Sequence, residues 1–498
     1  MGFSAIDYVV LLVYLAGITL FGMRFRKAHR SVKDYFVGSR NTPWIIICLS
    51  IVATETSTLT LIGVPALAYG TFPRPEQGGA LTYLQVLIGY IIGRFVIARL
   101  FLPSYFRGEL LTAYALLEQR FGAATRRAAA ALFLVLRALA EGVRVFAASL
   151  VLSAVLQSSF PSTHLWLWSI VIVGMLTLLY TFEGGIAAVI WTDLIQFVIY
   201  VGGSLLAGYE LLRLIPGGWT GFLDSARAAG KLQVWSFRWD LSVPFTFWAG
   251  VIGGTFLTNA THGTDQLLVQ RLLTCRNLRD SQKAIVTSGF IVLAQFVLFL
   301  GIGIMLFAYY QHAPRPPITT NDEIFPAFIV TTLPHGISGL VIAAIFAAAM
   351  SNLSGSLNSL ASTTVLDFYN PLTGGRASDR TLLGLSKWCT AAWGIVLIGI
   401  AILARGWGSV FTAGLTVASI VYGPMLGAFL LGVLTTRANA TGAMAGIAVS
   451  AASMLAIWWT TTLAWTWYVL VGTAICFGVG YSVSLAAAGR GTAVSVPS

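Results

Sequence analysis

Residues 342–369 read IAAIFAAAMSNLSGSLNSLASTTVLDFY, and this stretch decides the fold. It is long enough to cross a bilayer, yet serines and asparagines run through its middle. In hydrocarbon such groups find no water, so they must face protein, an ion or a wet cavity. The small and polar residues follow an i, i+3, i+4, i+7 rhythm, which places them on one helical face that either packs closely against another helix or ligates a small hard cation. The members of this face are Ala348, Ser351, Asn352, Gly355, Ser359 and Ser362.

The composition of the whole chain is that of a membrane protein with many spans. Hydrophobic residues make up 57% of the chain and charged residues only 10%, and there are 51 glycines among 498 residues. These proportions are typical of helical membrane proteins. The sequence therefore predicts an all-α integral membrane protein with about 13 transmembrane helices. Their expected ranges are 6–23, 43–70, 81–102, 128–157, 165–182, 186–212, 246–269, 284–310, 338–368, 384–404, 409–434, 441–460 and 466–488.

The charged residues predict how the chain lies in the membrane. Segment 6–23 has no basic region before it and no small-residue cleavage site, and RFRKAHR follows it, so we expect a retained helix rather than a signal peptide. With the N-terminus outside and the C-terminus in the cytoplasm, most of the 30 basic residues fall in inner loops. We expect a multi-pass protein of the plasma or inner cell membrane. Its net charge of +12 then reflects topology and anionic lipids rather than nucleic-acid binding.

Motifs of enzymes are missing from the sequence. Of the four cysteines, no two are placed for an extracellular disulfide, and none has a metal-binding spacing. We find no nucleotide loop, zinc motif or nucleophile elbow, and the loops are too short for a catalytic domain. We expect residues 1–498 to form one membrane domain that is not an enzyme.

Two of the expected spans are interrupted. Segment 43–70 runs through LSIVATETSTLTLIGVPALAYG, and segment 246–269 runs through WAGVIGGTFLTNATHGTDQLL. Hydroxyls, a charge and glycines let a helix unwind there and offer backbone groups to a ligand. The two breaks lie five spans apart, which predicts an inverted pair of five-helix repeats. The parts of the chain are then an extra helix at 6–23, repeats at 43–212 and 246–434, and two C-terminal helices at 441–488.

At this point the chain resembles the sodium/solute symporter family, which includes sodium-coupled sugar, proline, pantothenate and sialic acid carriers. The resemblance covers nearly the whole chain and implies thirteen helices, an inverted-repeat core and alternating access driven by sodium. The matching stretches are DYFVGSR at 34–40, ATETSTLTLIGVPALAY at 53–69, GGIAAVIWTDLIQ at 184–196, TDQLLVQR at 264–271, the tract 348–369 and IVYGPMLGAFLLGVL at 420–434.

The resemblance also implies a main sodium site, where the break in segment 43–70 meets the serine-rich helix. Its oxygens would be the backbone carbonyls of Ala53, Thr56 and Ala348 and the side chains of Ser351 and Asn352. Such a set suits Na⁺, a hard ion that takes about five or six oxygens. The chain departs from the family at position 352, where a second Ser or Thr is usual. Close helix packing is the alternative explanation of this face.

A carboxylate in span 186–212 is the second candidate for ion binding. Some relatives use the aspartate that matches Asp193, together with two serines, as a second sodium site. Here those two positions are Ser354 and Gly355, and Gly355 has no side-chain oxygen. We therefore expect a structural or cytoplasmic-exit role for Asp193, with a second sodium as the alternative.

The substrate cavity is expected between the two broken helices, near the bilayer midplane. Glu55 has several possible roles: it could contact a substrate ammonium group or the sodium shell, or pair with His262. His262 itself either titrates near neutral pH or serves as a neutral hydrogen-bonding residue. Sugar carriers often have a glutamine where this chain has Thr60, so a sugar is not favoured. The substrate candidates are Ser57, Thr60, Gln77, Thr258, Asn259, Thr261 and His262.

Three charged residues of span 128–157 bear on the charge of the substrate. Arg137, Glu141 and Arg144 share one helical face, where Glu141 can neutralise about one arginine. Arg137 is expected to be the arginine better placed to pair with Glu141. Arg144 would then be free to clamp a carboxylate with its planar fork, as a related sialic acid carrier does. The alternative is that both arginines bind Glu141, backbone carbonyls or lipid phosphate.

The sequence thus predicts a symporter that couples inward Na⁺ flow to uptake of a small polar organic solute, such as a carboxylate. One rival is a proton-coupled carrier on the same fold, with Glu55, Asp193 or His262 as the proton site. Another is a transporter-derived membrane sensor, which the lack of any signalling domain disfavours. The partners are sodium, the solute and the lipid bilayer, and the chain is compatible with a monomer.

Overall fold

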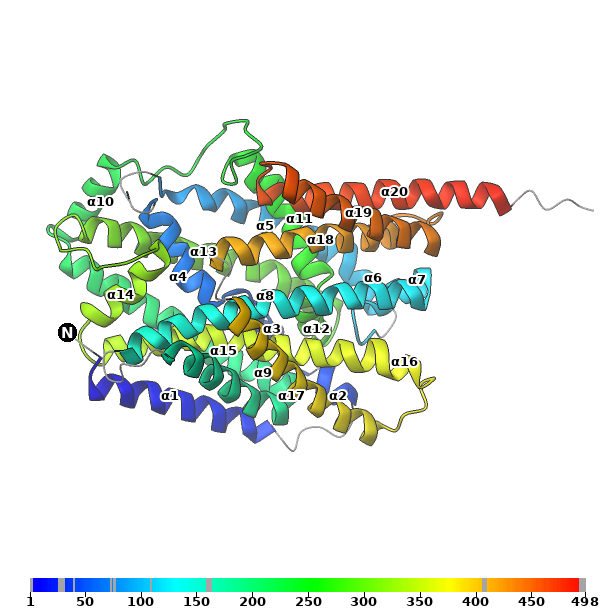
Figure 1. Ribbon diagram of the computed structural model, residues 1–498, viewed down its shortest axis with the longest axis horizontal. Coiled ribbons are helices and arrows are strands. Elements are labelled where there is room, and N and C mark those ends of the chain that lie inside the picture. Colours follow the sequence, from blue (N-terminus) through cyan, green and yellow to red (C-terminus); the bar gives the residue numbers. More distant parts are fainter. Residues whose placement is uncertain are drawn as a thin grey trace, which may run out of the picture.

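The computed structural model describes residues 3–25, 32–38, 41–71, 74, 78–107, 110–157, 164–404 and 410–491. Within these residues the protein is a bundle of helices without strands, and the helices run mostly along one common direction (Figure 1). Eight of the described helices are long and apolar enough to cross a membrane, or nine if a bent pair is counted as one span. The architecture is therefore all-helical and membrane-type, while thirteen crossings and the inverted repeat stay predictions.

The helices of the first half match the expected segments closely. Segments 165–182 and 186–212 form one assigned helix with a kink at Gly185, whose φ of 51° and ψ of −157° suit only glycine. The helices are α1 (Ala5–Met23), α2 (Val32–Val37), α3 (Trp44–Glu55), α4 (Thr58–Tyr69), α5 (Leu84–Val96), α6 (Leu102–Arg107), α7 (Ala115–Phe121), α8 (Ala123–Gln157), α9 (Leu165–Leu214) and α10 (Gly218–Ala228).

The described residues also contain three π-type turns and three 3-10 turns, of which two of each kind lie in the second half. A π-turn continues the serine-rich helix α15 at its end. The α-helices are α11 (Gly254–Gly263), α12 (Gln266–Leu273), α13 (Leu278–Tyr309), α14 (Ile324–Thr331), α15 (Ile337–Thr363), α16 (Asn370–Leu372), α17 (Asp379–Leu403), α18 (Val410–Leu434), α19 (Ala440–Thr460) and α20 (Tyr468–Gly491). The short turns are η2 (Leu81–Tyr83), η3 (Ile97–Phe101), η4 (Ala249–Gly253), η5 (Asn321–Glu323), η6 (Thr364–Tyr369) and η8 (Trp465–Trp467).

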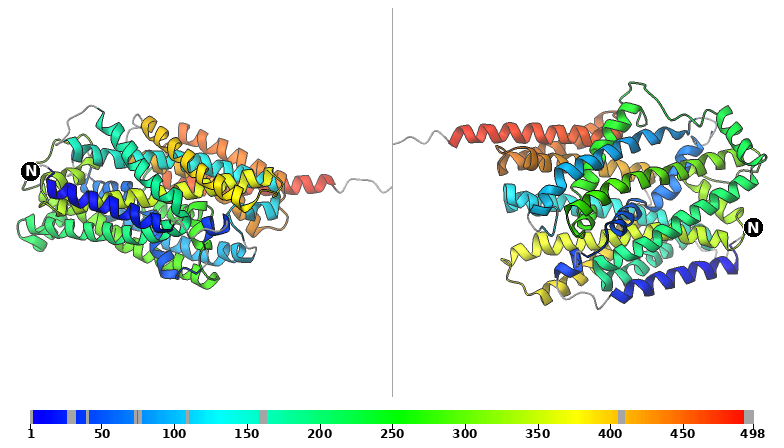
Figure 2. Two further views of the ribbon diagram at one scale, coloured as in Figure 1. Left: turned by 90° about the horizontal axis from the view of Figure 1, so that it is seen from below. Right: turned by 180° about the vertical axis from the view of Figure 1, so that it is seen from behind.

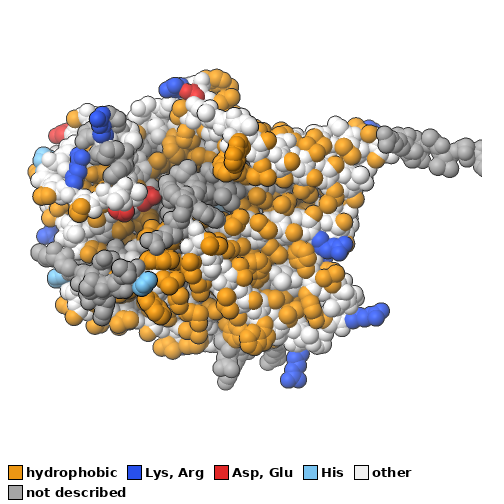
Figure 3. Space-filling view, in the orientation of Figure 1, with side chains coloured by type: hydrophobic (Ala, Val, Ile, Leu, Met, Phe, Trp, Pro, Cys, Tyr) orange, Lys and Arg blue, Asp and Glu red, His pale blue; other side chains and the backbone are white. Residues whose placement is uncertain are grey.

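The N-terminus and the end of α20 lie at opposite ends of the bundle (Figure 1). An odd number of crossings requires this arrangement. Helices α1 and α20 also lie on opposite flanks, as the views in Figure 2 show. Side chains on the face shown in Figure 3 are mostly hydrophobic along the middle, with Lys and Arg gathered toward the two ends. This distribution suits a protein whose middle faces lipid and whose ends face water.

Helix α15 forms the centre of the bundle and packs against α9, α1, α8, α17 and α3. The polar residues of its middle are buried, so each hydroxyl needs a partner within the protein. Ser354, Ser359 and Ser362 donate to carbonyls one turn back in their own helix, at 2.9 to 3.0 Å. Ser351, Asn352 and Ser356 instead reach other helices. The polar tract therefore joins α15 to its neighbours at a few positions only.

Candidate functional site

The first break separates α3 from α4, which are bent by 63° relative to one another. Thr56 adopts an extended backbone between them, with φ −85° and ψ 103°. The backbone N–H of Ser57 donates to Thr60 Oγ1 at 3.4 Å, whereas in a continuous helix it would donate to the carbonyl of Ala53. A hydroxyl that accepts from a nearby backbone N–H in this way replaces a hydrogen bond of the helix. The Thr-Glu-Thr-Ser run thus ends α3 and leaves carbonyls without helical partners.

The second break lies between α11 and α12, at Thr264 and Asp265. Thr264 Oγ1 donates to the carbonyl of Ala260 at 2.8 Å, and Asp265 caps α12 by accepting from the N–H of Leu267 at 2.9 Å. A cap of this type satisfies a backbone donor at the start of a helix. The break therefore has a fixed geometry, with the carboxylate of Asp265 at its centre.

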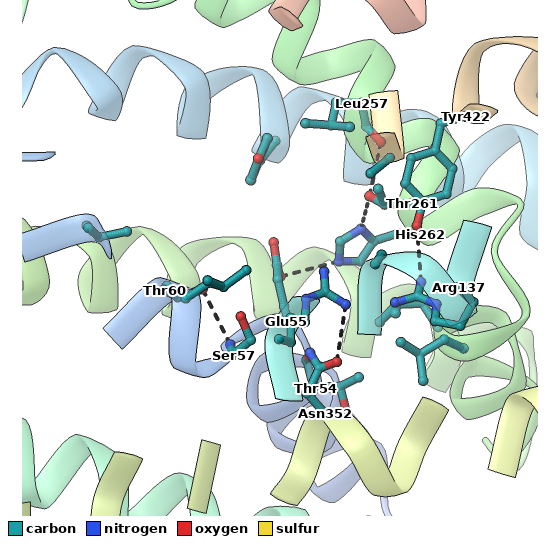
Figure 4. A pocket seen from close by; sticks show the side chains of 18 of the residues that line it. Thr54, Glu55, Ser57, Thr60, Arg137, Leu257, Thr261, His262, Asn352 and Tyr422 are labelled. Carbon is teal, nitrogen blue, oxygen red and sulfur yellow. Dashed lines mark hydrogen bonds and ion pairs between the residues drawn. The ribbon is translucent and has the colours of Figure 1, made fainter. Parts of the chain in front are cut away.

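A cavity of about 140 Å³ lies between the two breaks and receives side chains from both (Figure 4). Glu55 and His262 point toward one another there, while Arg137 and Tyr422 meet at another part of the wall. The residues that line the cavity are Thr54, Glu55, Ser57, Leu59, Thr60, Val64, Tyr83, Tyr90, Arg137, Ala140, Arg144, Leu257, Thr261, His262, Leu267, Leu268, Phe296, Asn352, Ala418 and Tyr422.

Glu55 belongs to a charged cluster beside the cavity. It forms an ion pair with Arg94 of α5, and its Oε2 lies 3.3 Å from His262 Nε2. Arg94 is fully buried and also donates to Ser288 Oγ at 2.9 Å. Thr261 Oγ1 lies 2.8 Å from His262 Nδ1. Because Arg94 already neutralises Glu55, this carboxylate is poorly suited to receive a substrate ammonium group.

The arginines of α8 pair differently from the sequence expectation. Arg137 forms an ion pair with Asp265 and donates to the hydroxyl of Tyr422 at 3.1 Å, so its expected pairing with Glu141 is wrong. Glu141 pairs with Arg144 at 3.2 Å, so neither arginine is without a counter-charge. The spacing along α8 allowed both pairings, and the long-range partner Asp265 decides between them.

Arg144 nevertheless retains free donors toward the cavity. Its side chain is 27% exposed, whereas that of Glu141 is 1% exposed. Only Nη1 is bonded within the described residues: it donates to Glu141 Oε2 at 3.2 Å and to Asn352 Oδ1 at 3.3 Å. The Nη2 and Nε donors find no protein partner in this part of the chain. Arg144 can therefore offer donors to an anionic group, while its Nη1 atom holds the guanidinium against Glu141 and Asn352.

The expected sodium ligands are all buried and lie around the contact of α3 with α15. Asn352 Nδ2 donates to the carbonyl of Thr54 at 2.5 Å, which joins α15 directly to the first break. Ser351 Oγ donates to Asp193 Oδ1 at 2.6 Å and keeps lone pairs for a cation. Asn352 thus reaches the first break between Ala53 and Thr56, on the helix that also carries Ala348 and Ser351. The role of these five residues as sodium ligands stays a prediction.

Asp193 already has a cation beside it. Arg271 of α12 donates to Asp193 Oδ2 at 3.1 Å, and both side chains are buried. Ser50, Thr54 and Ser351 add hydroxyl contacts at 2.5, 3.3 and 2.6 Å. Ser354, the other candidate for a second sodium, donates to the carbonyl of Ser351 instead.

Gly355 makes room for this arginine. A Cβ atom at position 355 would lie 2.6 Å from Nη2 and 3.1 Å from Nη1 of Arg271. The residue that lacks a ligand oxygen is thus the one against which the guanidinium packs. This arrangement favours the structural role of Asp193 over the second-sodium alternative.

The substrate candidates divide into three groups. Ser57, Thr60, Arg144, Thr261 and His262 line the cavity. Thr258 and Asn259 are buried but are not among the lining residues; Thr258 packs against Gly93, and Asn259 Nδ2 donates to the carbonyl of Thr255 at 2.8 Å. Gln77 lies outside the described residues.

Several residues of the site were not predicted. Tyr83 and Phe296 stack with ring centroids 5.3 Å apart and planes at 8°, and the hydroxyls of Tyr83 and Tyr90 lie 3.5 Å apart. The spacing of Tyr83 and Tyr90 by two helical turns is a signal that they share a face. No pattern in the sequence pointed to Phe296, or to Arg94 as the partner of Glu55.

The fold and the broken helices define a membrane transporter. The profile of the sodium:solute symporter family matches residues 35–450, and the chain belongs to this family.

Two relatives and one solved structure extend the comparison. The chain is 30% identical to a sodium/sialic acid symporter of Proteus mirabilis, over 95% of this chain and 93% of the relative. It is 29% identical to human sodium-coupled monocarboxylate transporter 1, over 89% of this chain and 71% of the relative. A substrate-bound, outward-open structure of a Na⁺-coupled sialic acid symporter matches 97% of this chain and 98% of its own, with a TM-score of 0.87 and 29% identity.

Proposed function

We propose that this protein is a sodium-coupled symporter that imports a small organic monoanion by alternating access. One observation carries the proposal: Arg144 lines a cavity between two broken helices, with free donors, next to the expected sodium ligands. The sialic acid and monocarboxylate carriers among its relatives support it, because sialic acids and monocarboxylates both carry a carboxylate.

The charges around the cavity support an anion. Arg94, Arg137 and Arg144 are balanced by Glu55, Asp265 and Glu141, so the side chains of the site together are close to neutral. A bound Na⁺ adds one positive charge to a site of low dielectric constant. A monoanion would restore neutrality, whereas a cationic solute would add to the repulsion.

The size and the lining of the cavity favour a small substrate. Its volume of about 140 Å³ is close to that of a cavity that holds benzene. Tyr83, Phe296 and several leucines supply an apolar wall, opposite the polar groups of the two breaks. We therefore favour a monocarboxylate with a compact apolar body over a bulky sugar acid.

The network of Arg137, Asp265 and Tyr422 would close the cytoplasmic side. It joins α8 and α18 to the start of α12, which leads toward a loop expected inside the cell. Sodium and substrate would favour the closed arrangement, and sodium release would loosen it, as a population shift requires. Opening to the cytoplasm would separate Arg137 from Asp265.

A thermal-shift screen of the purified protein tests this proposal. Lactate, N-acetylneuraminate, glucose and proline would each be added in NaCl or in choline chloride of equal strength. We expect a monocarboxylate to stabilise the protein only in sodium, because a bound ligand raises the stability of the folded state. Uptake of that solute into proteoliposomes should then follow the sodium gradient at fixed pH. Uptake driven by a pH gradient without sodium would contradict the proposal and favour the proton-coupled rival.

A further inference from the structure

Asn352 connects the expected sodium site to the expected substrate arginine. Its Nδ2 donates to the carbonyl of Thr54 in the first break at 2.5 Å, and its Oδ1 accepts from Arg144 Nη1 at 3.3 Å. The side chain is buried, with an exposed fraction of 2%. Thr54, Arg144 and Asn352 all line the same cavity. One amide group therefore contacts both sites at once.

The orientation of this amide leaves a single oxygen for two cations. Nδ2 is used by the carbonyl of Thr54, so Oδ1 is the only atom of the side chain that can ligate sodium. The same Oδ1 already accepts from the guanidinium of Arg144. Two positive charges that share one oxygen lie a few Å apart, where they repel strongly in a poorly solvated site. Occupation by sodium must therefore weaken the contact with Arg144.

We propose that Asn352 is the coupling residue of the transporter: sodium binding at its Oδ1 releases Arg144 to receive the substrate anion. This proposal rests on the proposed function and deepens it. Coupling of this kind is reciprocal. If bound sodium raises the affinity of Arg144 for the anion by some factor, the bound anion, which draws Arg144 away from Asn352, must raise the affinity for sodium by the same factor.

The identity of residue 352 explains why this chain has such a link. An asparagine side chain reaches further than a serine, so it contacts Thr54 with one atom and Arg144 with the other. A serine at this position still offers a ligand oxygen but is too short for both contacts. Arg144 has a second partner, Glu141 Oε2 at 3.2 Å, which keeps the guanidinium in place after it leaves Asn352.

The test measures binding of ²²Na⁺ alone to the purified full-length protein, so no substrate needs to be known. Four proteins are compared: wild type, Arg144→Gln, Asn352→Ser and the double variant. Removal of the competing guanidinium should tighten sodium binding in Arg144→Gln. Part of this gain in sodium affinity comes from the unpaired charge of Glu141, and this part should also be seen when residue 352 is serine. The part that acts through Asn352 should be absent when residue 352 is serine. Arg144→Gln should therefore raise the sodium affinity about fivefold more with Asn352 than with serine at that position.

A second measurement uses only the wild-type protein. Phenylglyoxal labels accessible arginines, and mass spectrometry reports the labelling of Arg144 in NaCl and in choline chloride, with Arg137 as internal reference. Sodium should raise the labelling of Arg144 relative to Arg137. Two results would overturn the role of Asn352 but leave the symporter proposal standing, provided that the wild-type protein binds sodium. One is that Arg144→Gln changes the sodium affinity equally with Asn352 and with serine at that position. The other is that sodium leaves the labelling of Arg144 relative to Arg137 unchanged. Absence of sodium binding to the wild-type protein would overturn both.

Discussion

The side chains of the serine-rich helix divide by the partners of their hydroxyls. Ser354, Ser359 and Ser362 donate to carbonyls of their own helix, so these hydrogen bonds do not join α15 to another helix. Ser351 and Asn352 reach Asp193 and Thr54 on other helices. Neighbouring residues of one polar tract therefore have different roles, and their substitution should have different consequences.

Ser351→Ala should weaken sodium activation strongly. The change removes an expected ligand oxygen and one donor to Asp193, while alanine keeps the helix intact. Loss of a hydrogen bond or ligand to a charged group costs about 1.5 to 3 kcal/mol, which is about ten- to a hundredfold in affinity. The measurement is the sodium concentration for half-maximal uptake in proteoliposomes. Ser354→Ala is the matched control and should change it little. Equally small effects of the two substitutions would remove Ser351 from the site.

Arg144→Lys should cost much of the affinity for the anion, although the charge is kept. An ammonium group cannot reproduce the planar fork that binds a carboxylate with two bonds. We expect a loss of about 1.5 to 3 kcal/mol, about ten- to a hundredfold, in the binding constant of the solute found by the screen. Glu141 keeps a cationic partner in this variant, which limits misfolding.

Arg137→Lys is the comparison for Arg144→Lys. Arg137 is occupied by Asp265 and Tyr422, so its substitution should slow transport more than it weakens binding. Thermal unfolding of both variants, compared with wild type, must show folded protein before the binding constants are read. Small and equal losses of affinity in the two variants would leave a neutral substrate as the better explanation.

The residue types of the site were predictable, but their pairing was not. Hydroxyls and amides within an apolar span have few explanations, so their positions pointed to Ser351, Asn352 and Thr261, and the family resemblance implied that the first two are sodium ligands. Pairing depends on which helices meet: Arg94 lies 39 residues from Glu55, and Arg137 lies 128 residues from Asp265. Local spacing favoured Glu141 for Arg137 because it ignores such contacts.

At the scale of elements, glycines set how closely the two sides of the cavity approach. Gly89 and Gly93 of α5 face the segment that contains Gly250 and Gly254. A Cβ atom at Gly89 would lie 2.5 Å from the carbonyl oxygen of Val251, and one at Gly254 would lie 2.5 Å from that of Val86. Small residues four apart on both partners are typical of closely packed membrane helices.

Gly89→Ala should destabilise the protein because the added methyl group has no space. Overpacking of a tight contact costs about 1 to 3 kcal/mol. Gly301→Ala in α13 is the control, since a Cβ atom there meets nothing within 4 Å. That change should be neutral or stabilise by up to about 1 kcal/mol, because alanine is the better helix former. Thermal unfolding in detergent measures both. A stabilising effect of Gly89→Ala would show that α5 and α11 do not pack as described.

The elements themselves were largely predictable. The break between α3 and α4 and the break between α11 and α12 fall within the segments expected to be interrupted, because runs of hydroxyls and glycines disfavour a continuous apolar helix. The kink at Gly185 was expected only as a boundary between spans. Length and hydropathy give the helices, whereas the angle between them depends on packing against other elements.

At the scale of the whole molecule, several buried charges of the described residues form pairs that join different helices. Glu55 pairs with Arg94, and Asp193 pairs with Arg271, across helix contacts. An unpaired charge would be costly within a membrane, so each pair restricts which helices can separate during transport. The pairing also keeps the binding region near neutral before any ion enters.

This balance predicts that one sodium ion accompanies one monoanion and that transport moves no net charge. Arg271 occupies the place beside Asp193 where a second cation would lie, and Gly355 leaves room for it. Sodium-dependent uptake should therefore show a Hill coefficient near one, with no transport current in proteoliposomes on a planar membrane.

Asp193→Asn tests the same balance. It should leave the Hill coefficient unchanged while it slows transport, because it removes the counter-charge of buried Arg271 rather than an ion ligand. Loss of one partner of a buried pair costs about 3 to 5 kcal/mol, so the double variant Asp193→Asn/Arg271→Gln should recover part of the stability that the single variant loses. Thermal unfolding checks this recovery. A coefficient near two in wild type that falls to near one in Asp193→Asn would instead establish a second sodium at Asp193, and the guanidinium of Arg271 would then have to move away during the transport cycle.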